Sequence, residues 1–226
     1  MEKNLNKEQP RLILVDGPPA GGKTTLAESL KAGGLQDSIS FNTKQEFEQG
    51  FKELVKQMPA SRALYFSTER MENGLVGKMV EAISKHKNFL LEVPLDLKTF
   101  LTLDDNFKKA GFKVEMNFIC PDSVADCELR IQGKGKMNFG LPEANLKANY
   151  ANSLKNLNDI SIIASRLNIY DGTKTPQLLA TMEKGKIIMA DPVSLKKEWI
   201  QRMPNIASAI KRHLGQTQKK SRGKKM

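Results

Sequence analysis

Residues 11–25 read RLILVDGPPAGGKTT, and this stretch decides the fold of the chain. Residues 11–16 form a continuous apolar run that ends in an acid, which is typical of a strand buried on both faces of a sheet. Residues 17–24 match G-x-x-x-x-G-K-[ST], the pattern of a phosphate-binding P-loop, and a predicted helix follows over residues 26–31. A glycine turn with a purely structural role is the alternative, but it does not explain the Lys-Thr-Thr that opens the helix.

Each position of the loop has a chemical reason. Backbone N–H groups can surround a phosphate only where no Cβ intrudes, and the following helix adds the positive end of its dipole. Lys23 brings a point charge to the β- and γ-phosphate oxygens, and the hydroxyl of Thr24 ligates Mg²⁺. We therefore expect ATP or GTP to be bound, with Mg²⁺, by Gly17, Pro18, Pro19, Ala20, Gly21, Gly22, Lys23, Thr24 and Thr25.

Predicted strands and helices alternate along the chain, which indicates an α/β protein of the P-loop NTPase fold, with a mostly parallel sheet flanked by helices on both faces. Residues 1–10 are expected to be an N-terminal extension, residues 11–212 a P-loop kinase-like domain, and residues 213–226 a basic, disordered tail. Strands are expected at residues 11–16, 38–41, 89–94, 112–120 and 167–172, helices at 74–86, 98–110 and 145–160, and a hairpin over 178–189.

The composition of the 226 residues is that of an ordinary globular protein, with 39% hydrophobic and 27% charged residues. No apolar run reaches the roughly 20 residues that a membrane span needs, and the first residues do not have the pattern of a secretory signal. Two cysteines are too few for a disulfide framework and have no zinc-binding spacing. We expect two ordinary thiols and a cytoplasmic location.

The net charge of +11 is concentrated at the end of the chain. Seven Lys or Arg residues and no acid follow residue 210, which leaves +4 for the rest of the chain. Such a tail can bind RNA, an acidic partner or a membrane surface, and a solvated tail without a specific target is the alternative.

Two acids stand at the carboxyl ends of predicted strands, where open parallel sheets bind their ligands. Asp16 lies beside the glycine-rich loop and is expected to tune the loop or to contact substrate. Glu92 follows three apolar residues of a predicted buried strand, where a carboxylate is costly unless it has a function or a partner. Glu92 is therefore a candidate to act on the metal or the acceptor, and a satisfied ion pair at the strand end is the alternative.

Charge on the transferred phosphoryl group calls for a cation beyond the sheet. Arg130 is expected late in a helix, just before the basic segment 132–136, and this combination suits a lid that closes over phosphates. Lys134 and Lys136 are further candidates for the same role. An exposed arginine on a polar helix face is the alternative.

Taken together, residues 17–25, LLEVP at 90–94, AGFKV at 110–114 and LR at 129–130 resemble the zeta toxin family, the P-loop kinases of bacterial toxin–antitoxin systems. Members of that family have an I-I-E-G-T strand end, then G-Y-x-V leading into the next strand, then a lid that carries arginine. The order and spacing are similar here from about residue 11 to about residue 190.

The resemblance implies an activity and a set of roles. Members use ATP and Mg²⁺ to phosphorylate the 3′-hydroxyl of UDP-N-acetylglucosamine, and an antitoxin protein is their partner. By position, Lys23 and Thr24 would hold nucleotide and metal, Glu92 would bind the small-molecule acceptor, and Arg130 would be a catalytic lid arginine.

Three departures from the family pattern concern catalysis. Asn42 stands where the family has an Asp that orients the acceptor hydroxyl; an amide can accept a hydrogen bond there but cannot take the proton. Residues 137–142 contain no second lid arginine, and Val93-Pro94 replaces the G-T after the acid. Asn42 is still assigned a catalytic and acceptor-binding role.

Three hypotheses follow. The chain is a zeta-like kinase that acts on a small hydroxylated or nucleotide-sugar acceptor, with Glu92 or a nearby acid in place of the missing base. Alternatively, it is a catalytically degraded relative that binds nucleotide and acts through a partner. In the third hypothesis, the basic tail binds RNA or another partner, and the P-loop is a regulatory switch.

Overall fold

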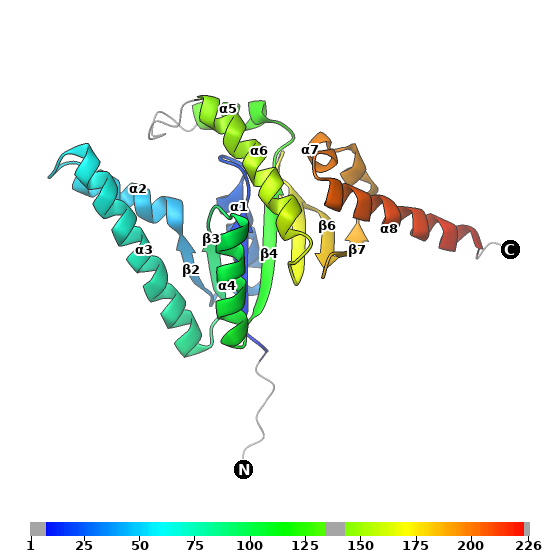
Figure 1. The fold of residues 1–226 in the computed structure, drawn as a ribbon, viewed down its shortest axis with the longest axis horizontal. Coiled ribbons are helices and arrows are strands. Elements are labelled where there is room, and N and C mark those ends of the chain that lie inside the picture. Colours follow the sequence, from blue (N-terminus) through cyan, green and yellow to red (C-terminus); the bar gives the residue numbers. More distant parts are fainter. Residues whose placement is uncertain (1–7, 134–142, 224–226) are drawn as a thin grey trace, which may run out of the picture.

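The computed structural model describes residues 8–133 and 143–223, and within these ranges it contains one seven-stranded sheet (Figure 1). The strand order is β2-β3-β1-β4-β5-β6-β7, in which β1 to β5 are parallel and β6 and β7 are antiparallel. The predicted fold class is confirmed. The strands are β1 (Arg11–Asp16), β2 (Ile39–Asn42), β3 (Phe89–Glu92), β4 (Lys113–Cys120), β5 (Arg166–Asp171), β6 (Gln177–Glu183) and β7 (Lys186–Ala190).

Alternate residues of β1 enter different cores, as a strand covered on both faces requires. Ile13 and Val15 pack with α1 on one face, whereas Leu12 and Leu14 belong to the larger core under α4, α6 and α8 on the other. The helical segments are α1 (Lys23–Leu30), the π-helix η1 (Lys31–Leu35), α2 (Thr43–Leu54), α3 (Ala60–Lys85), α4 (Leu97–Lys109), α5 (Val124–Gly133), α6 (Glu143–Ile160), the 3₁₀-helix η2 (Pro192–Lys196), α7 (Glu198–Gln201) and α8 (Pro204–Gly223).

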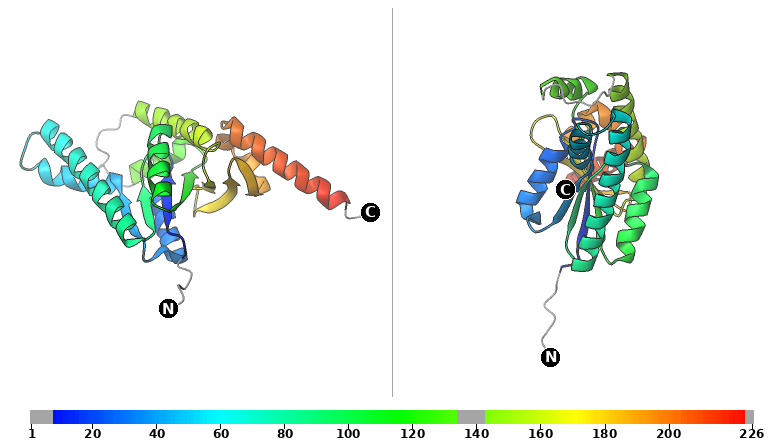
Figure 2. Two further views of the ribbon diagram at one scale, coloured as in Figure 1. Left: turned by 60° about the horizontal axis from the view of Figure 1, so that its bottom comes forward. Right: turned by 90° about the vertical axis from the view of Figure 1, so that its left-hand side faces the viewer.

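α3 is twice as long as expected. It begins at Ala60, not at residue 74, and forms with α2 a hairpin that projects beyond the β2 edge of the sheet (Figures 1 and 2). The first half of α3 has no single apolar stripe, because consecutive Leu64, Tyr65 and Phe66 are all exposed. Helical periodicity is therefore weak in this half, which is why only the second half was predicted.

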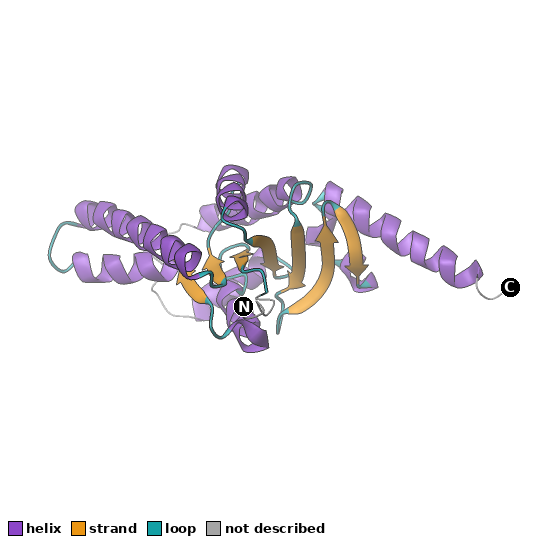
Figure 3. Ribbon diagram, turned by 90° about the horizontal axis from the view of Figure 1, so that it is seen from below, coloured by secondary structure: helices purple, strands orange, loops and turns teal. Residues whose placement is uncertain are grey.

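α8 projects from the opposite end of the molecule (Figure 3). Its first turns are anchored by buried Ile206 and Ile210, and the helix then continues as far as Gly223. Most of the segment expected to be a disordered tail is thus helical, although the division of the chain at residue 212 stays a prediction. Across the described ranges, none of the helices has the length and apolar character to cross a bilayer.

Candidate active site

The P-loop connects the end of β1 to the start of α1, as predicted. Gly17 lies against β4, where a Cβ would come 2.1 Å from the carbonyl oxygen of Ile119. Gly22 has the left-handed φ of 105° and directly precedes α1. Both positions therefore need glycine, because a side chain would either collide with β4 or strain the backbone. Phosphates commonly bind at the N-terminus of a helix, so the start of α1 is the position expected for a nucleotide phosphate.

Lys23 folds back over the loop. Its Nζ donates to the carbonyl oxygens of Gly17, at 2.7 Å, and Pro18, at 3.0 Å. Burial lowers the pKa of Lys23, against the opposing effect of the Asp16 carboxylate, and the nearby charge of Lys44 lowers it further. Phosphate oxygens are stronger acceptors than these carbonyls, so the amine is ready to exchange them for a polyphosphate.

Thr24 and Glu92 lie together at the carboxyl edge of the sheet. The Thr24 hydroxyl donates to Glu92 Oε2 at 3.0 Å, and Glu92 is paired in register with Val15 of β1 on one side and Asn42 of β2 on the other. A hydroxyl and a carboxylate are the oxygen donors that suit Mg²⁺. Among the described residues, no three His, Cys, Asp or Glu side chains gather as metal ligands.

Asp16 is not available to a bound substrate, because only 2% of the residue is exposed. Burial raises its pKa to about 7, although the charge of Lys23 and the backbone N–H groups of Gly17 and Leu95 act to lower it. Within the described part of the chain, its Oδ2 has no hydrogen-bond partner. Of the two roles expected for Asp16, tuning of the loop is compatible with this burial, and contact with substrate is not.

Arg130 is neither a free lid arm nor an exposed surface residue. Its Nη1 donates to the carbonyl oxygen of Ala20 in the P-loop at 3.2 Å. Its Nη2 donates to the carbonyl oxygens of Gly172 and, at 2.8 Å, Thr173 in the β5–β6 loop. The guanidinium therefore joins two loops at the nucleotide end of the sheet. Lys134 and Lys136, the other candidates for a lid cation, lie outside the described residues.

The β5–β6 loop is a component of the site that sequence reasoning did not identify. A Cβ on Gly172 would come 2.5 Å from the carbonyl oxygen of Gly21, so this loop approaches the P-loop as closely as only glycine allows. The Asp-Gly at residues 171–172 was predicted only as the end of a strand with a turn. Its position beside the P-loop follows from the pairing of β4 with β5.

Asn42 lies at the predicted edge of the sheet but is used as a helix cap. Its Oδ1 accepts the N–H of Gln45 at 3.0 Å and caps the N-terminus of α2. Beside it, the Thr43 hydroxyl donates to the backbone carbonyl of Glu92 at 3.1 Å. The structure thus brings Asn42 next to Glu92, but the side-chain oxygen of Asn42 already accepts a hydrogen bond from the first turn of α2.

Both cysteines are buried and unbridged. Burial raises the pKa of Cys120 above its ordinary value and that of Cys127 to about 11. Thiols with such pKa values are poor nucleophiles at neutral pH, in agreement with the expectation of two ordinary thiols.

The structure contains a P-loop, an adjoining carboxylate at Glu92 and a helix that carries Arg130, which are the features that resemble the zeta toxin family. A family model described as Zeta toxin matches residues 1–138. The chain belongs to the zeta toxin family. In this zeta toxin family member the match includes the P-loop, Glu92 and Arg130, whereas β5 to α8 lie beyond it.

Solved structures agree with this assignment at the level of the fold. The PezAT toxin–antitoxin system of Streptococcus pneumoniae is 17% identical with a TM-score of 0.60, covering 95% of this chain and 89% of that chain. A candidate kinase from Chloroflexus aurantiacus is 19% identical with a TM-score of 0.50, over 63% and 75%. The AvrRxo1-ORF1:-ORF2 complex with ATP gives 13% identity and a TM-score of 0.51, over 90% and 76%. A comparison with curated protein sequences finds no match.

Proposed function

We propose that this zeta toxin family member is a kinase that uses ATP or GTP with Mg²⁺ and transfers the γ-phosphoryl group to a hydroxyl of a small acceptor. The observation that carries the proposal is the convergence of Lys23, Thr24 and Glu92 at the carboxyl edge of the central strands, with a 3.0 Å contact between Thr24 and Glu92. Nucleotide sugars such as UDP-N-acetylglucosamine are the first acceptors to test, because the family resemblance implies them.

In this proposal, each residue of the site has a distinct role. Lys23 would leave the carbonyls of the loop and stabilise the charge on the β- and γ-phosphate oxygens, and the Thr24 hydroxyl would release Glu92 and hold Mg²⁺. The carboxylate of Glu92 is then free to accept a hydrogen bond from the acceptor hydroxyl and to take its proton as the phosphoryl group is transferred. Arg130 holds the β5–β6 loop against the P-loop and so shapes the nucleotide site.

A second candidate function is nucleotide binding without transfer. The observation that favours it is the cap formed by Asn42: the side chain in the family's base position hydrogen-bonds α2 and cannot accept a proton. Positioning and charge contribute more than a general base to phosphoryl transfer through a loose transition state. The absence of a base at Asn42 therefore does not rule out kinase activity.

An antitoxin protein is proposed as the partner, and the cytoplasm as the location. Support for the partner comes from the PezAT toxin–antitoxin system and from the AvrRxo1-ORF1:-ORF2 complex, both of which have the same fold as this chain. Binding of RNA or an acidic partner through the basic C-terminal end is a separate proposal, which deletion of residues 215–226 would test by retention on an RNA column or by partner pulldown.

Two assays on one set of variants separate the two functions. Calorimetry with a non-hydrolysable ATP analogue and Mg²⁺ measures nucleotide binding, and transfer of labelled γ-phosphate to a panel of nucleotide sugars measures kinase activity. The kinase proposal expects binding and transfer in the wild type and loss of both in Lys23→Ala. Binding without transfer to any acceptor on the panel would reject nucleotide sugars as acceptors and favour the second function.

A further inference from the structure

Lys197, in the turn between η2 and α7, lies between two carboxylates from distant parts of the chain. Its Nζ is 2.5 Å from Asp171 Oδ2 at the end of β5 and 2.8 Å from Asp122 Oδ1 in the loop after β4. The side chains of Lys197 and Asp171 are only 14% and 13% exposed. These charges are therefore far better shielded from water than an ordinary surface pair, and each depends on the other for its solvation.

The second oxygen of Asp171 acts on the β5–β6 loop. Asp171 Oδ1 accepts the backbone N–H of Thr173 at 2.8 Å and the Thr173 hydroxyl at 2.5 Å. The backbone carbonyl oxygens of this loop accept hydrogen bonds from Nη2 of Arg130. Its Nη1 donates to the carbonyl oxygen of Ala20 in the P-loop. An unbroken series of polar contacts thus runs from Lys197 through Asp171, Thr173 and Arg130 to the P-loop.

The charges of this series are fixed by one another. Partial burial acts to lower the pKa of Lys197, but the hydrogen bonds to Asp122 and Asp171 hold this pKa above its ordinary value. Partial burial acts to raise the pKa of Asp171, but the hydrogen bonds from Lys197 and Thr173 hold this pKa below its ordinary value. The pair is therefore ionised at neutral pH, and loss of Lys197 would leave an unpaired carboxylate directly behind a loop that touches the phosphate site.

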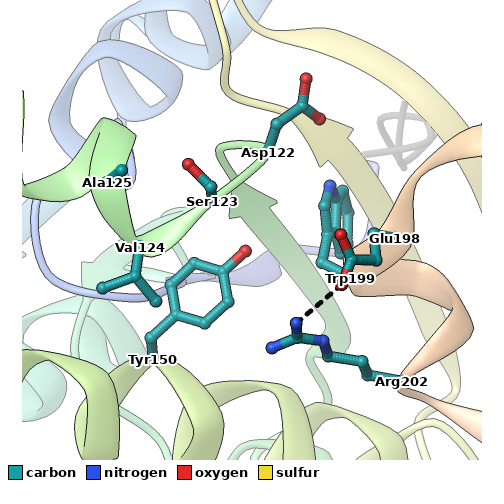
Figure 4. Close-up of a pocket in the computed structure, with 8 residues that line it drawn as sticks. All are labelled: Asp122, Ser123, Val124, Ala125, Tyr150, Glu198, Trp199 and Arg202. Carbon is teal, nitrogen blue, oxygen red and sulfur yellow. Dashed lines mark hydrogen bonds and ion pairs between the residues drawn. The ribbon is translucent and has the colours of Figure 1, made fainter.

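The turn that carries Lys197 is itself held by the core. Trp199, two residues further on, is 1% exposed and packs on Phe118 of β4 with ring centroids 6.4 Å apart. A cavity of about 250 Å³ lies beside Trp199. It is lined by Trp199, by Asp122 and by the Glu198–Arg202 ion pair, among others (Figure 4). Because Trp199 anchors α7 in the core, the backbone of the neighbouring Lys197 is held in place, and its amine is held beside Asp171.

We propose that Lys197 is a positioning residue for nucleotide binding: through Asp171 it holds the β5–β6 loop, and with it Arg130, against the P-loop. The inference rests on the proposed nucleotide binding and adds a contribution from the C-terminal part of the chain, beyond the residues that the family model matches. It makes the affinity of the P-loop for nucleotide depend on a side chain that does not touch the nucleotide.

The test compares four variants by calorimetry with a non-hydrolysable ATP analogue and Mg²⁺, with the thermal midpoint Tm of each variant measured beside it. Lys197→Met should weaken nucleotide binding about ten-fold or more, and Lys197→Arg should restore the Kd to within about three-fold of the wild type. Lys196→Met removes the same charge from an exposed neighbour and should leave the Kd unchanged. Asp122→Asn removes the charge of the other partner of Lys197, which stands in the loop after β4, and should change Tm more than Kd.

The outcomes separate the inference from the function on which it rests. Absence of binding in the wild type would reject the proposed function and the inference with it. Wild-type binding with an unchanged Kd in Lys197→Met would reject the inference alone. If Lys197→Met does not fold, Asp171→Asn takes its place, because it keeps the shape of the side chain and removes the charge. Equal loss of affinity in Asp171→Asn and Asp122→Asn would then show a merely structural ion cluster and overturn the inference.

Discussion

The hydroxyl of Thr24 donates a 3.0 Å hydrogen bond to the carboxylate of Glu92, although the two residues are 68 positions apart in the chain. The contact exists because β1 and β3 are parallel neighbours, so that the loop after β1 and the last residue of β3 emerge at the same edge of the sheet. It joins the side chain expected to ligate the metal to the side chain expected to act on the acceptor.

Glu92→Gln separates binding from transfer. A glutamine can still accept the hydrogen bond of Thr24, but it cannot take a proton from the acceptor. Nucleotide affinity should stay within about three-fold of the wild type, whereas phosphoryl transfer should fall by about a hundred-fold or more. Glu53→Gln, in the exposed α2–α3 hairpin, is the matched control and should leave both quantities unchanged. Full transfer activity in Glu92→Gln would remove Glu92 from the mechanism.

Asn42→Asp restores a carboxylate to the position where the family has one. Aspartate caps helices as well as asparagine, so α2 should keep its stability and the rate of phosphoryl transfer should rise. Asn42→Ala, in contrast, removes the cap and should lower the free energy of unfolding by about 1 kcal/mol. The measurements are initial transfer rates and denaturant titrations. A lower rate in Asn42→Asp would count against this position as a site for the base.

Gly172→Ala tests the close approach of the β5–β6 loop to the P-loop. The added Cβ would lie 2.5 Å from the carbonyl oxygen of Gly21 and 2.8 Å from Ile119 Cγ1, so one of the loops must move. We expect nucleotide binding to weaken about ten-fold or more and the stability to fall by about 1–3 kcal/mol. Gly33→Ala is the control, because in the described part of the chain a Cβ there would point into open space. Equal nucleotide affinities in the two variants would contradict the proposed role of the β5–β6 loop.

The raised pKa of Asp16 predicts that the free energy of unfolding depends on pH. Its pKa of about 7 in the folded protein lies above the ordinary value of 3.8, so the folded state binds more protons than the unfolded state between these values. Stability contributed by the protonated carboxyl is therefore complete below about pH 4 and is lost as the pH rises to about 7.

Asp16→Asn removes this loss and should be more stable than the wild type at pH 8, by up to about 4 kcal/mol, with little difference at pH 4. Thermal unfolding across this pH range measures the effect, and Asp105→Asn in the exposed pair with Lys109 should have almost none. A constant difference between Asp16→Asn and wild type at every pH would mean that Asp16 does not titrate in this range.

The central part of the fold and of the site was predictable because its signals are local. An apolar run before a glycine-rich motif predicted β1 and the P-loop, and an acid after FLL predicted that Glu92 ends a buried strand. Local patterns also predicted the parallel sheet, since strands and helices alternate along the chain. The family resemblance from the region around Glu92 and Arg130 is confirmed by the family match.

The remainder depends on contacts between segments that are distant in the sequence. The strand order, the bridge of Arg130 to Ala20 and Thr173, and the pairing of Lys197 with Asp171 are set by tertiary packing, for which a single sequence carries no periodic signal. The first half of α3 and the end of α8 were missed for another reason. Both project from the body, where burial does not impose an apolar stripe on the helix.

The most direct test of the central claim, that residues 17–24 hold a nucleoside triphosphate, is calorimetric titration of wild type, Lys23→Ala and Lys31→Ala with a non-hydrolysable ATP analogue and Mg²⁺. Lys31 lies just after α1, and its amine donates a 2.9 Å hydrogen bond to the hydroxyl of Ser40. Wild type and Lys31→Ala should bind with the same Kd, and Lys23→Ala should bind about thirty-fold more weakly or not at all. No binding by the wild type, or the same Kd in Lys23→Ala, would contradict the claim.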